Sequence, residues 1–172
     1  VLAAVIALLS RSYRALHQQA RTDVLTGLLN RRALTQRFKA LALRNDTPLE
    51  VIYIDLNKFK PINDHYGHAV GDRFLMHVAS ILNTYVNAKE AGRIGGDEFV
   101  VLRPLKSSEV GNTDSVRAIV DHLREHPFVF EKGELTIHAS VGRAEFPAEG
   151  RSLEELLHVA DERMYEDKNK DV

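Results

Sequence analysis

The chain has 172 residues, about the size of one domain, and 44% of them are hydrophobic, which is sufficient for a buried core. Its net charge of −1 excludes the strongly basic balance of many nucleic-acid-binding domains, so no nucleic acid is expected as a partner. With no cysteine, the sequence has no disulfide framework, no thiolate metal site and no cysteine nucleophile.

Residues 1–22 are predicted to form an N-terminal linker helix. Apolar side chains recur there at alternating spacings of four and three, at Leu2, Ile6, Leu9, Tyr13, Leu16 and Ala20. This pattern is a heptad seam about three repeats long, which favours a parallel helix pair and therefore a homodimer. A single amphipathic helix packed on its own domain is the alternative.

The apolar run Val1–Leu9 has two interpretations. Followed by Arg11 and Arg14, it is typical of the inner end of a membrane span, because such spans need about 20 apolar residues and carry basic cytoplasmic flanks. An apolar interaction helix is the other interpretation. Because the sequence begins with Val1, we expect it to be part of a longer protein, with this part a cytoplasmic domain attached to an inner membrane through the missing N-terminal region.

Residues 23–172 are predicted to form one α/β (α+β) domain. The expected elements are a helix over about 28–44, a nearly apolar strand over 51–56, a turn-rich stretch over 61–71, a helix over about 72–86, two strands joined by Gly95-Gly96, a helix over about 114–126, a hairpin turning at Lys132-Gly133 and a helix over about 153–168. The strand leaving the second hairpin, 135–141, alternates apolar and polar residues, so one face should be buried. This order predicts a mixed central sheet flanked by helices.

Three acids stand at strand ends. Asp97 and Glu98 follow the glycine pair and lead into the apolar run Phe99–Leu102, and Asp55 ends the strand over 51–56. Clustered carboxylates repel one another and burial disfavours their charged forms, but a hard dication such as Mg²⁺ removes both penalties. If the two strands pair, the acids converge, and two ions about 4 Å apart could bridge a triphosphate and activate a hydroxyl. A merely polar hairpin is the alternative.

Several motifs, in the right order, resemble those of the GGDEF-domain diguanylate cyclases over about residues 21–168. They are Asp23–Arg32, Asp55–Asp64, Gly67–Asp72, Arg93–Phe99 and Ala160–Lys168. The resemblance implies a palm-like sheet of the nucleotide-cyclase type. It also implies that two facing chains each hold one GTP, that each ribose 3′-hydroxyl attacks the other α-phosphate, and that cyclic di-GMP forms with release of two pyrophosphates. The predicted helix pair in the linker would set this dimer.

The resemblance also implies metal-binding and catalytic roles. Asp55 and Asp97 match the family's metal ligands, with the Leu56 carbonyl as a further oxygen, and two Mg²⁺ or Mn²⁺ ions per nucleotide are expected. Glu98 matches the acid that helps to deprotonate the 3′-hydroxyl. Because neighbouring acids around a metal titrate together, we assign both metal binding and catalysis to Asp97 and Glu98 jointly.

Asn63 and Asp72 match the family's guanine-binding residues. Guanine offers N1–H and N2–H donors to a carboxylate, whereas adenine presents an acceptor at N1 and would leave the acid unpaired. The alternatives are a helix N-cap for Asp72, since a helix is expected to begin there, and an ordinary turn residue for Asn63.

Lys60 and Lys168 match the family's phosphate-binding cations. Phe59 and Lys60 open a short helix, whose free N–H groups also suit phosphate. Lys168 could instead be a solvated charge near the end of its helix, and Arg93 could either bind phosphate or pair with an acid.

Three departures from the family are visible, of which Asn57 in place of a frequent Asp has little effect if Asn57 is not a metal ligand. The segment Val86–Lys89 lacks both the Arg and the Asp of the family's product-inhibition motif, so no allosteric product site is expected, and Val172 stands where relatives often carry Arg. Besides an active cyclase, the sequence is compatible with a GTP-binding but inactive module that regulates an attached domain. A cyclase making an adenine or mixed product is a third hypothesis, which Asp72 disfavours.

Overall fold

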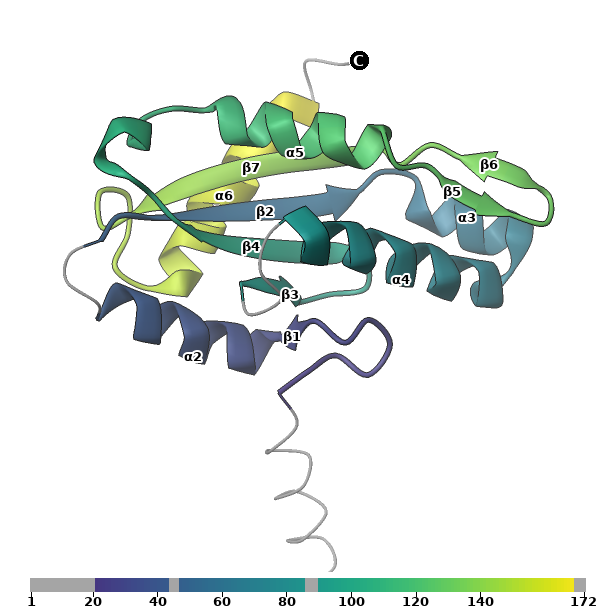
Figure 1. Ribbon diagram of the computed structural model, residues 1–172, viewed down its shortest axis with the longest axis horizontal. Helices are drawn as coiled ribbons and strands as arrows, with labels where there is room; N and C mark the ends of the chain where they lie inside the picture. Colours follow the sequence, from purple (N-terminus) through teal and green to yellow (C-terminus); the bar gives the residue numbers. More distant parts are fainter. Residues whose placement is uncertain (1–20, 44–46, 86–89, 169–172) are drawn as a thin grey trace, which may run out of the picture.

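The computed structural model describes residues 21–43, 47–85 and 90–168, so most of the predicted linker helix and the possible membrane segment lie outside the described residues. The elements are β1 (Leu29–Asn30), α2 (Arg31–Ala42), β2 (Leu49–Leu56), α3 (Phe59–Tyr66), α4 (His68–Tyr85), β3 (Ala91–Arg93), β4 (Glu98–Pro104), a 3₁₀ turn (Ser107–Glu109), α5 (Asp114–Arg124), β5 (Phe128–Phe130), β6 (Gly133–Leu135), β7 (Ala139–Phe146) and α6 (Leu153–Lys168). A five-stranded sheet has the order β1-β3-β4-β2-β7, and β5-β6 form a separate hairpin (Figure 1). The predicted mixed sheet with flanking helices is confirmed.

Strand β2 separates two apolar layers. Its neighbours β4 and β7 are both antiparallel to it, and alternate β2 side chains point to opposite faces. Ile52, Ile54 and Leu56 pack with α4, α5 and the β5-β6 hairpin. Leu49, Val51 and Tyr53 pack with α2 and α6 on the other face, and α6 is seen behind the sheet in Figure 1. A strand covered on both faces explains why its sequence is nearly all apolar.

Helix α6 packs against β7 at Gly142. A Cβ atom at this position would lie 1.8 Å from the Ala160 carbonyl oxygen and 2.9 Å from the Met164 nitrogen. Both are backbone atoms of α6, so they cannot turn aside as a side chain would. Glycine is therefore required by close approach and not by backbone conformation.

Gly142→Ala should accordingly destabilise the domain by about 3 kcal/mol or more, as overpacking of a rigid contact does. Gly96→Ala is the matched control, because no atom lies within 4 Å of its added Cβ. Urea unfolding followed by circular dichroism measures both variants. Equal midpoints for Gly142→Ala and wild type would contradict the close packing of α6 on β7.

The predicted turn-rich stretch is mostly helical, and the short helix expected to open at Phe59 and Lys60 is confirmed. Residues 59–66 form α3, and Pro61 lies in its first turn, where a missing N–H removes no intrahelical hydrogen bond. Gly67, with φ of 85°, separates α3 from α4, which begins at His68. Asp72 therefore lies inside α4, and the N-cap interpretation of Asp72 is wrong.

Two other predicted elements differ in their bounds. The helix expected from residue 28 begins at Arg31, after the two-residue strand β1, and the Asn30 side chain caps it by accepting from the Ala33 N–H at 3.0 Å. The strand expected over 135–141 is divided between two sheets, because the chain must leave the hairpin to reach the edge of β2. At this crossing the His138 carbonyl accepts a hydrogen bond from the Asn57 N–H at 2.8 Å, and Ile137 stays buried.

Among the residues that the structure describes, no helix is both long enough and apolar enough to cross a bilayer.

Candidate active site

Strands β2 and β4 bring the predicted acids to one end of the sheet. In the antiparallel register Asp55 is directly opposite Glu98, and the Leu56 N–H donates to the Asp97 carbonyl at 3.1 Å. Residues directly opposite on paired strands project to the same face, so the carboxylates of Asp55 and Glu98 are neighbours. The strand pairing on which convergence of the acids depends is confirmed.

Tyr53 binds Glu98 from the same face of the sheet. It lies two residues before Asp55, and its hydroxyl donates a short hydrogen bond to Oε1 of Glu98. Burial, followed by the hydrogen bond to Glu98 and the charges of Glu98, Asp161 and Asp55, raises the pKa of Tyr53 well above its ordinary value. The phenol therefore keeps its proton at neutral pH and acts as a donor to the carboxylate.

Gly95 makes room for the second oxygen of Glu98. An added Cβ at Gly95 would lie 1.8 Å from Oε2 of Glu98 and 2.7 Å from its carboxyl carbon. A side chain at Gly95 would therefore displace the carboxylate, which occupies the space where that side chain would begin. The carboxylate of Glu98 is held between the Tyr53 hydroxyl and the bare Cα of Gly95.

Arg93 supports the turn. Its Nη2 and Nε donate to the Gly96 carbonyl at 2.7 and 3.2 Å, and its Nη1 lies 3.1 Å from Oδ1 of Asp23. Of the two predicted alternatives for Arg93, the structure shows the pairing with an acid. Asp23 also accepts from the Thr26 N–H at 2.9 Å and the Thr26 hydroxyl at 2.7 Å. Burial alone would raise the pKa of Asp23, but the hydrogen bonds from Thr26 and Arg93 outweigh it and lower this pKa.

The predicted guanine-binding residues come from two adjoining helices. Asn63 lies on α3 and Asp72 on α4, and the Asn63 amide rests directly on Gly71: an added Cβ there would be 1.9 Å from Oδ1 of Asn63. The structure thus brings Asn63 beside the backbone that carries Asp72, whose side chain is exposed. Asn63 and the backbone before Asp72 are close together because α3 and α4 are joined by a single glycine, Gly67.

Of the two predicted phosphate-binding lysines, only Lys60 has a side chain within the described part of the structure. Lys60 is exposed in the first turn of α3. The ring of Phe59 stacks on Phe74 at 6.2 Å between centroids, so this side chain anchors α3 to the core and leaves only its backbone to the site. Lys168 is the last residue of α6, and its side chain lies outside the described part of the chain.

The donor set fits a magnesium ion held jointly with substrate. The carboxylates of Asp55, Asp97 and Glu98 and the Leu56 carbonyl offer only oxygen donors, and Mg²⁺ is usually held by one or two carboxylates plus substrate phosphates. Within the described residues, no three His, Cys, Asp or Glu side chains lie close enough together to hold a metal ion, so Asp55, Asp97 and Glu98 do not form a ready-made cage. A site completed by phosphate oxygens agrees with this arrangement.

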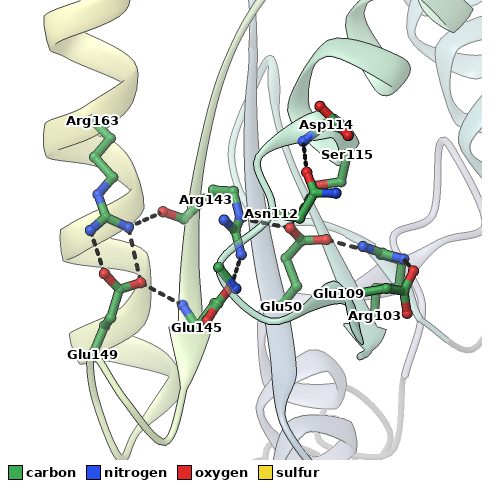
Figure 2. A network of polar contacts seen from close by, with 11 residues as sticks. Glu50, Arg103, Glu109, Asn112, Asp114, Ser115, Arg143, Glu145, Glu149 and Arg163 are labelled. Carbon is green, nitrogen blue, oxygen red and sulfur yellow. Dashed lines mark hydrogen bonds and ion pairs between the residues drawn. The ribbon is translucent and has the colours of Figure 1, made fainter. Parts of the chain in front are cut away.

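A cavity of about 460 Å³ lies elsewhere, between α5, β7 and α6, and four arginines line it: Arg117, Arg124, Arg143 and Arg163. Two of these arginines, Arg143 and Arg163, are already paired in a network of ions near Glu50, at the end of β2 away from Asp55 (Figure 2). Arg143 binds Glu50 and Glu145, and Arg163 binds Glu149. The lining of the cavity includes none of the predicted site residues, so this cavity is not the candidate active site.

Glu50 is the centre of that network. Its carboxylate is fully buried on β2 and accepts from Arg103 at 2.9 Å and from the Ser115 hydroxyl at 2.5 Å, while Nε of Arg143 lies 2.7 Å from it. Arg103 reaches onward to Glu109 at 2.7 Å. A buried charge is tolerated only when it is paired and hydrogen-bonded, so these contacts maintain the fold at this end of the sheet.

Comparison with known proteins gives the family. The model of the diguanylate cyclase, GGDEF domain, matches residues 20–171. The bifunctional diguanylate cyclase/cyclic di-GMP phosphodiesterase MucR of Pseudomonas aeruginosa is 36% identical over 166 residues, 94% of this chain and 24% of that protein. Diguanylate cyclase DgcP of Escherichia coli is 36% identical over 173 residues, 96% of this chain and 49% of that protein. The chain therefore spans at most about half the length of these two relatives.

Solved structures share the fold. A sensory box/GGDEF family protein from Caulobacter crescentus aligns with a TM-score of 0.78 at 36% identity, covering 88% of this chain and 99% of that one. The coiled coil and GGDEF domain of DgcB from the same organism, solved in complex with c-di-GMP, aligns with a TM-score of 0.73 at 28% identity, covering 98% and 93%. The fold is thus the α+β, nucleotide-cyclase type. The chain belongs to the GGDEF-domain family of diguanylate cyclases.

Proposed function

We propose that this chain condenses two GTP molecules into cyclic di-GMP and releases two pyrophosphates. The observation that carries the proposal is the β2-β4 register, which sets Asp55 opposite Glu98 and bonds Leu56 to Asp97. Two chains, each holding one GTP, would face each other across a two-fold axis, because a two-fold product suits an isologous dimer. Each ribose 3′-hydroxyl would then attack the α-phosphate of the other nucleotide.

Asp55, Asp97, Glu98 and the Leu56 carbonyl would hold Mg²⁺ or Mn²⁺, with two ions expected per nucleotide. The bound ions would neutralise phosphate charge and lower the pKa of the attacking hydroxyl. Glu98 would orient that hydroxyl and help to remove its proton, since its carboxylate lies at the same strand end. Asp97 is adjacent to Glu98, so the two acids would accept the proton of the 3′-hydroxyl jointly.

Recognition of GTP would come from α3, α4 and α6. Asn63 and Asp72 would bind the guanine edge, and Lys60 and Lys168 the phosphates, as the family resemblance implies. Arg93 would act indirectly, because its guanidinium already binds the Gly96 carbonyl and Asp23 and so fixes the turn before Asp97.

We further propose that residues 1–22 pair two chains as parallel helices and connect the domain to a membrane-attached N-terminal region on the cytoplasmic side. The heptad pattern supports the pairing. The similarity to a DgcB structure described as a coiled coil and GGDEF domain gives further support.

The direct test is incubation of the purified protein with GTP and Mg²⁺, followed by chromatography and mass analysis. We expect cyclic di-GMP and two pyrophosphates per product molecule, with no conversion of ATP. Bound but unconverted GTP would instead favour the alternative of an inactive regulatory module that controls an attached domain.

Feedback inhibition through the segment before β3 is not expected, because Val86–Lys89 lacks the charged residues of the family's product-inhibition motif. Isothermal titration with cyclic di-GMP, in the presence of excess 3′-deoxy-GTP to cover the active site, measures any second site. Tight binding of a stacked product dimer that is lost on substituting residues 86–89 would refute this prediction.

A further inference from the structure

The side chain of Tyr53 has no role in the chemistry proposed above, yet it contacts one of the acids that does. We propose that Tyr53 is a positioning residue that fixes the carboxylate of Glu98 for metal and substrate. This inference rests on the proposed function of the site. It follows from the hydrogen bond of the Tyr53 hydroxyl to Oε1 of Glu98 and from the position of Oε2 over Gly95.

The need for positioning comes from the flexibility of glutamate. Its carboxylate is separated from the backbone by three rotatable bonds, and holding it in one place costs conformational entropy that contacts must offset. Here the two oxygens have different surroundings: Tyr53 holds Oε1, and Oε2 occupies the space left by the missing side chain of Gly95. The rotation of the Glu98 carboxylate is thus restricted at both oxygens, at Oε1 by Tyr53 and at Oε2 by its place over Gly95.

The location of Tyr53 supports the same role. It faces the layer made by α2 and α6, where the buried residues around its ring are apolar and a phenylalanine would fill the same space, while the acids Glu98, Asp161 and Asp55 lie near its hydroxyl. A buried hydroxyl in such a layer needs a hydrogen-bond partner, and here the partner is Glu98, the residue opposite Asp55. Because β2 side chains alternate, Tyr53 and Asp55 share one face, so a single strand carries a metal ligand and the residue that orients the facing acid.

Tyr53→Phe removes this one hydroxyl and nothing else. Hydrogen bonds to ligating carboxylates are typically worth 10- to 100-fold in metal affinity or activity. We therefore expect Mn²⁺ affinity, measured by electron paramagnetic resonance with 3′-deoxy-GTP bound, to fall about tenfold. In the same variant kcat for cyclic di-GMP should fall about 10- to 100-fold, with KM for GTP changing less than about twofold.

The matched control is Tyr85→Phe. Tyr85 is a half-buried tyrosine on α4, on the opposite face of the sheet, and burial likewise raises its pKa. It should leave Mn²⁺ affinity and kcat unchanged. A third comparison uses Glu98→Gln: because Tyr53 acts through Glu98, adding Tyr53→Phe to Glu98→Gln should lower Mn²⁺ affinity no further.

The outcomes separate this inference from the proposed function. Unchanged Mn²⁺ affinity and kcat in Tyr53→Phe would overturn it, and so would tighter Mn²⁺ binding, since Tyr53 would then withhold Glu98 from the site. An additive loss on the Glu98→Gln background would also overturn it. If wild type forms no cyclic di-GMP but Tyr53→Phe still weakens Mn²⁺ binding, the proposed reaction fails and the role of Tyr53 stands. A wild type that binds no Mn²⁺ would contradict both.

Discussion

Replacing Asp55 with asparagine should lower kcat for cyclic di-GMP by about a thousandfold, or about 4 kcal/mol of barrier. The amide would keep the shape of the side chain but lose the negative charge that offsets a dication. Asp55 is one residue from the end of β2, opposite Glu98, so its loss leaves the remaining acids without their partner across the strand pair. The expected cause is weaker metal binding, so a high Mg²⁺ concentration should partly restore kcat.

Steady-state kinetics over a range of Mg²⁺ concentrations measures this effect, and circular dichroism checks that the fold persists. Asp121→Asn is a suitable control, because Asp121 is an exposed acid on α5 whose nearest arginine nitrogen, on Arg117, is 3.8 Å away. It should retain wild-type kinetics. An Asp55→Asn enzyme with more than about a tenth of wild-type kcat at ordinary Mg²⁺ would contradict the assigned metal role.

Gly71→Ala should raise KM for GTP by about 10- to 100-fold, as expected when a site built to hydrogen-bond a substrate loses a partner. The added Cβ would take the place of Oδ1 of Asn63, 1.9 Å away, and push the amide aside. The displaced atom is the end of a flexible side chain, so the fold should tolerate the change. Alanine is in fact favoured over glycine inside a helix by about 1 kcal/mol. Loss of GTP binding together with equal or greater stability is therefore the distinctive expected result.

Initial rates against GTP concentration, with urea unfolding in parallel, test this combination. Asn63→Ala should reproduce the rise in KM, and the double variant should be no worse than either single variant, because both act through one amide. An unchanged KM in Gly71→Ala would show that the Asn63 amide does not contact the base.

Features set by local sequence are predictable. The apolar strand around Val51–Leu56 and the Gly95-Gly96 turn are evident because alternation, apolar runs and glycine act within a few residues. Pairing of those two strands is not evident from either strand alone, so convergence of the acids stays conditional until the β2-β4 register is known. The sequence of α3 favours turns because Pro61 and Gly67 usually interrupt helices, although here proline occupies the first turn and glycine the end.

Contacts between distant residues are not predictable in the same way. Arg93 and Asp23 are 70 residues apart, and nothing local to either chooses pairing over phosphate binding. Glu50 and its arginines lie on three strands, so the buried ion network emerges only from the register of the sheet. One sequence feature points to the contact of Tyr53 with the acids: Tyr53 lies two residues before Asp55, and residues at that spacing share a face of a strand.

The central claim, that acids from β2 and the turn before β4 share a divalent ion with GTP, is tested most directly by a crystal structure with Mn²⁺ and 3′-deoxy-GTP. Anomalous scattering locates manganese independently of the interpretation of the nucleotide. We predict a peak within coordination distance of Asp55, Asp97 and the nucleotide phosphates. Guanine nucleotide bound with no peak near these carboxylates, or with manganese held by other side chains, would contradict the account.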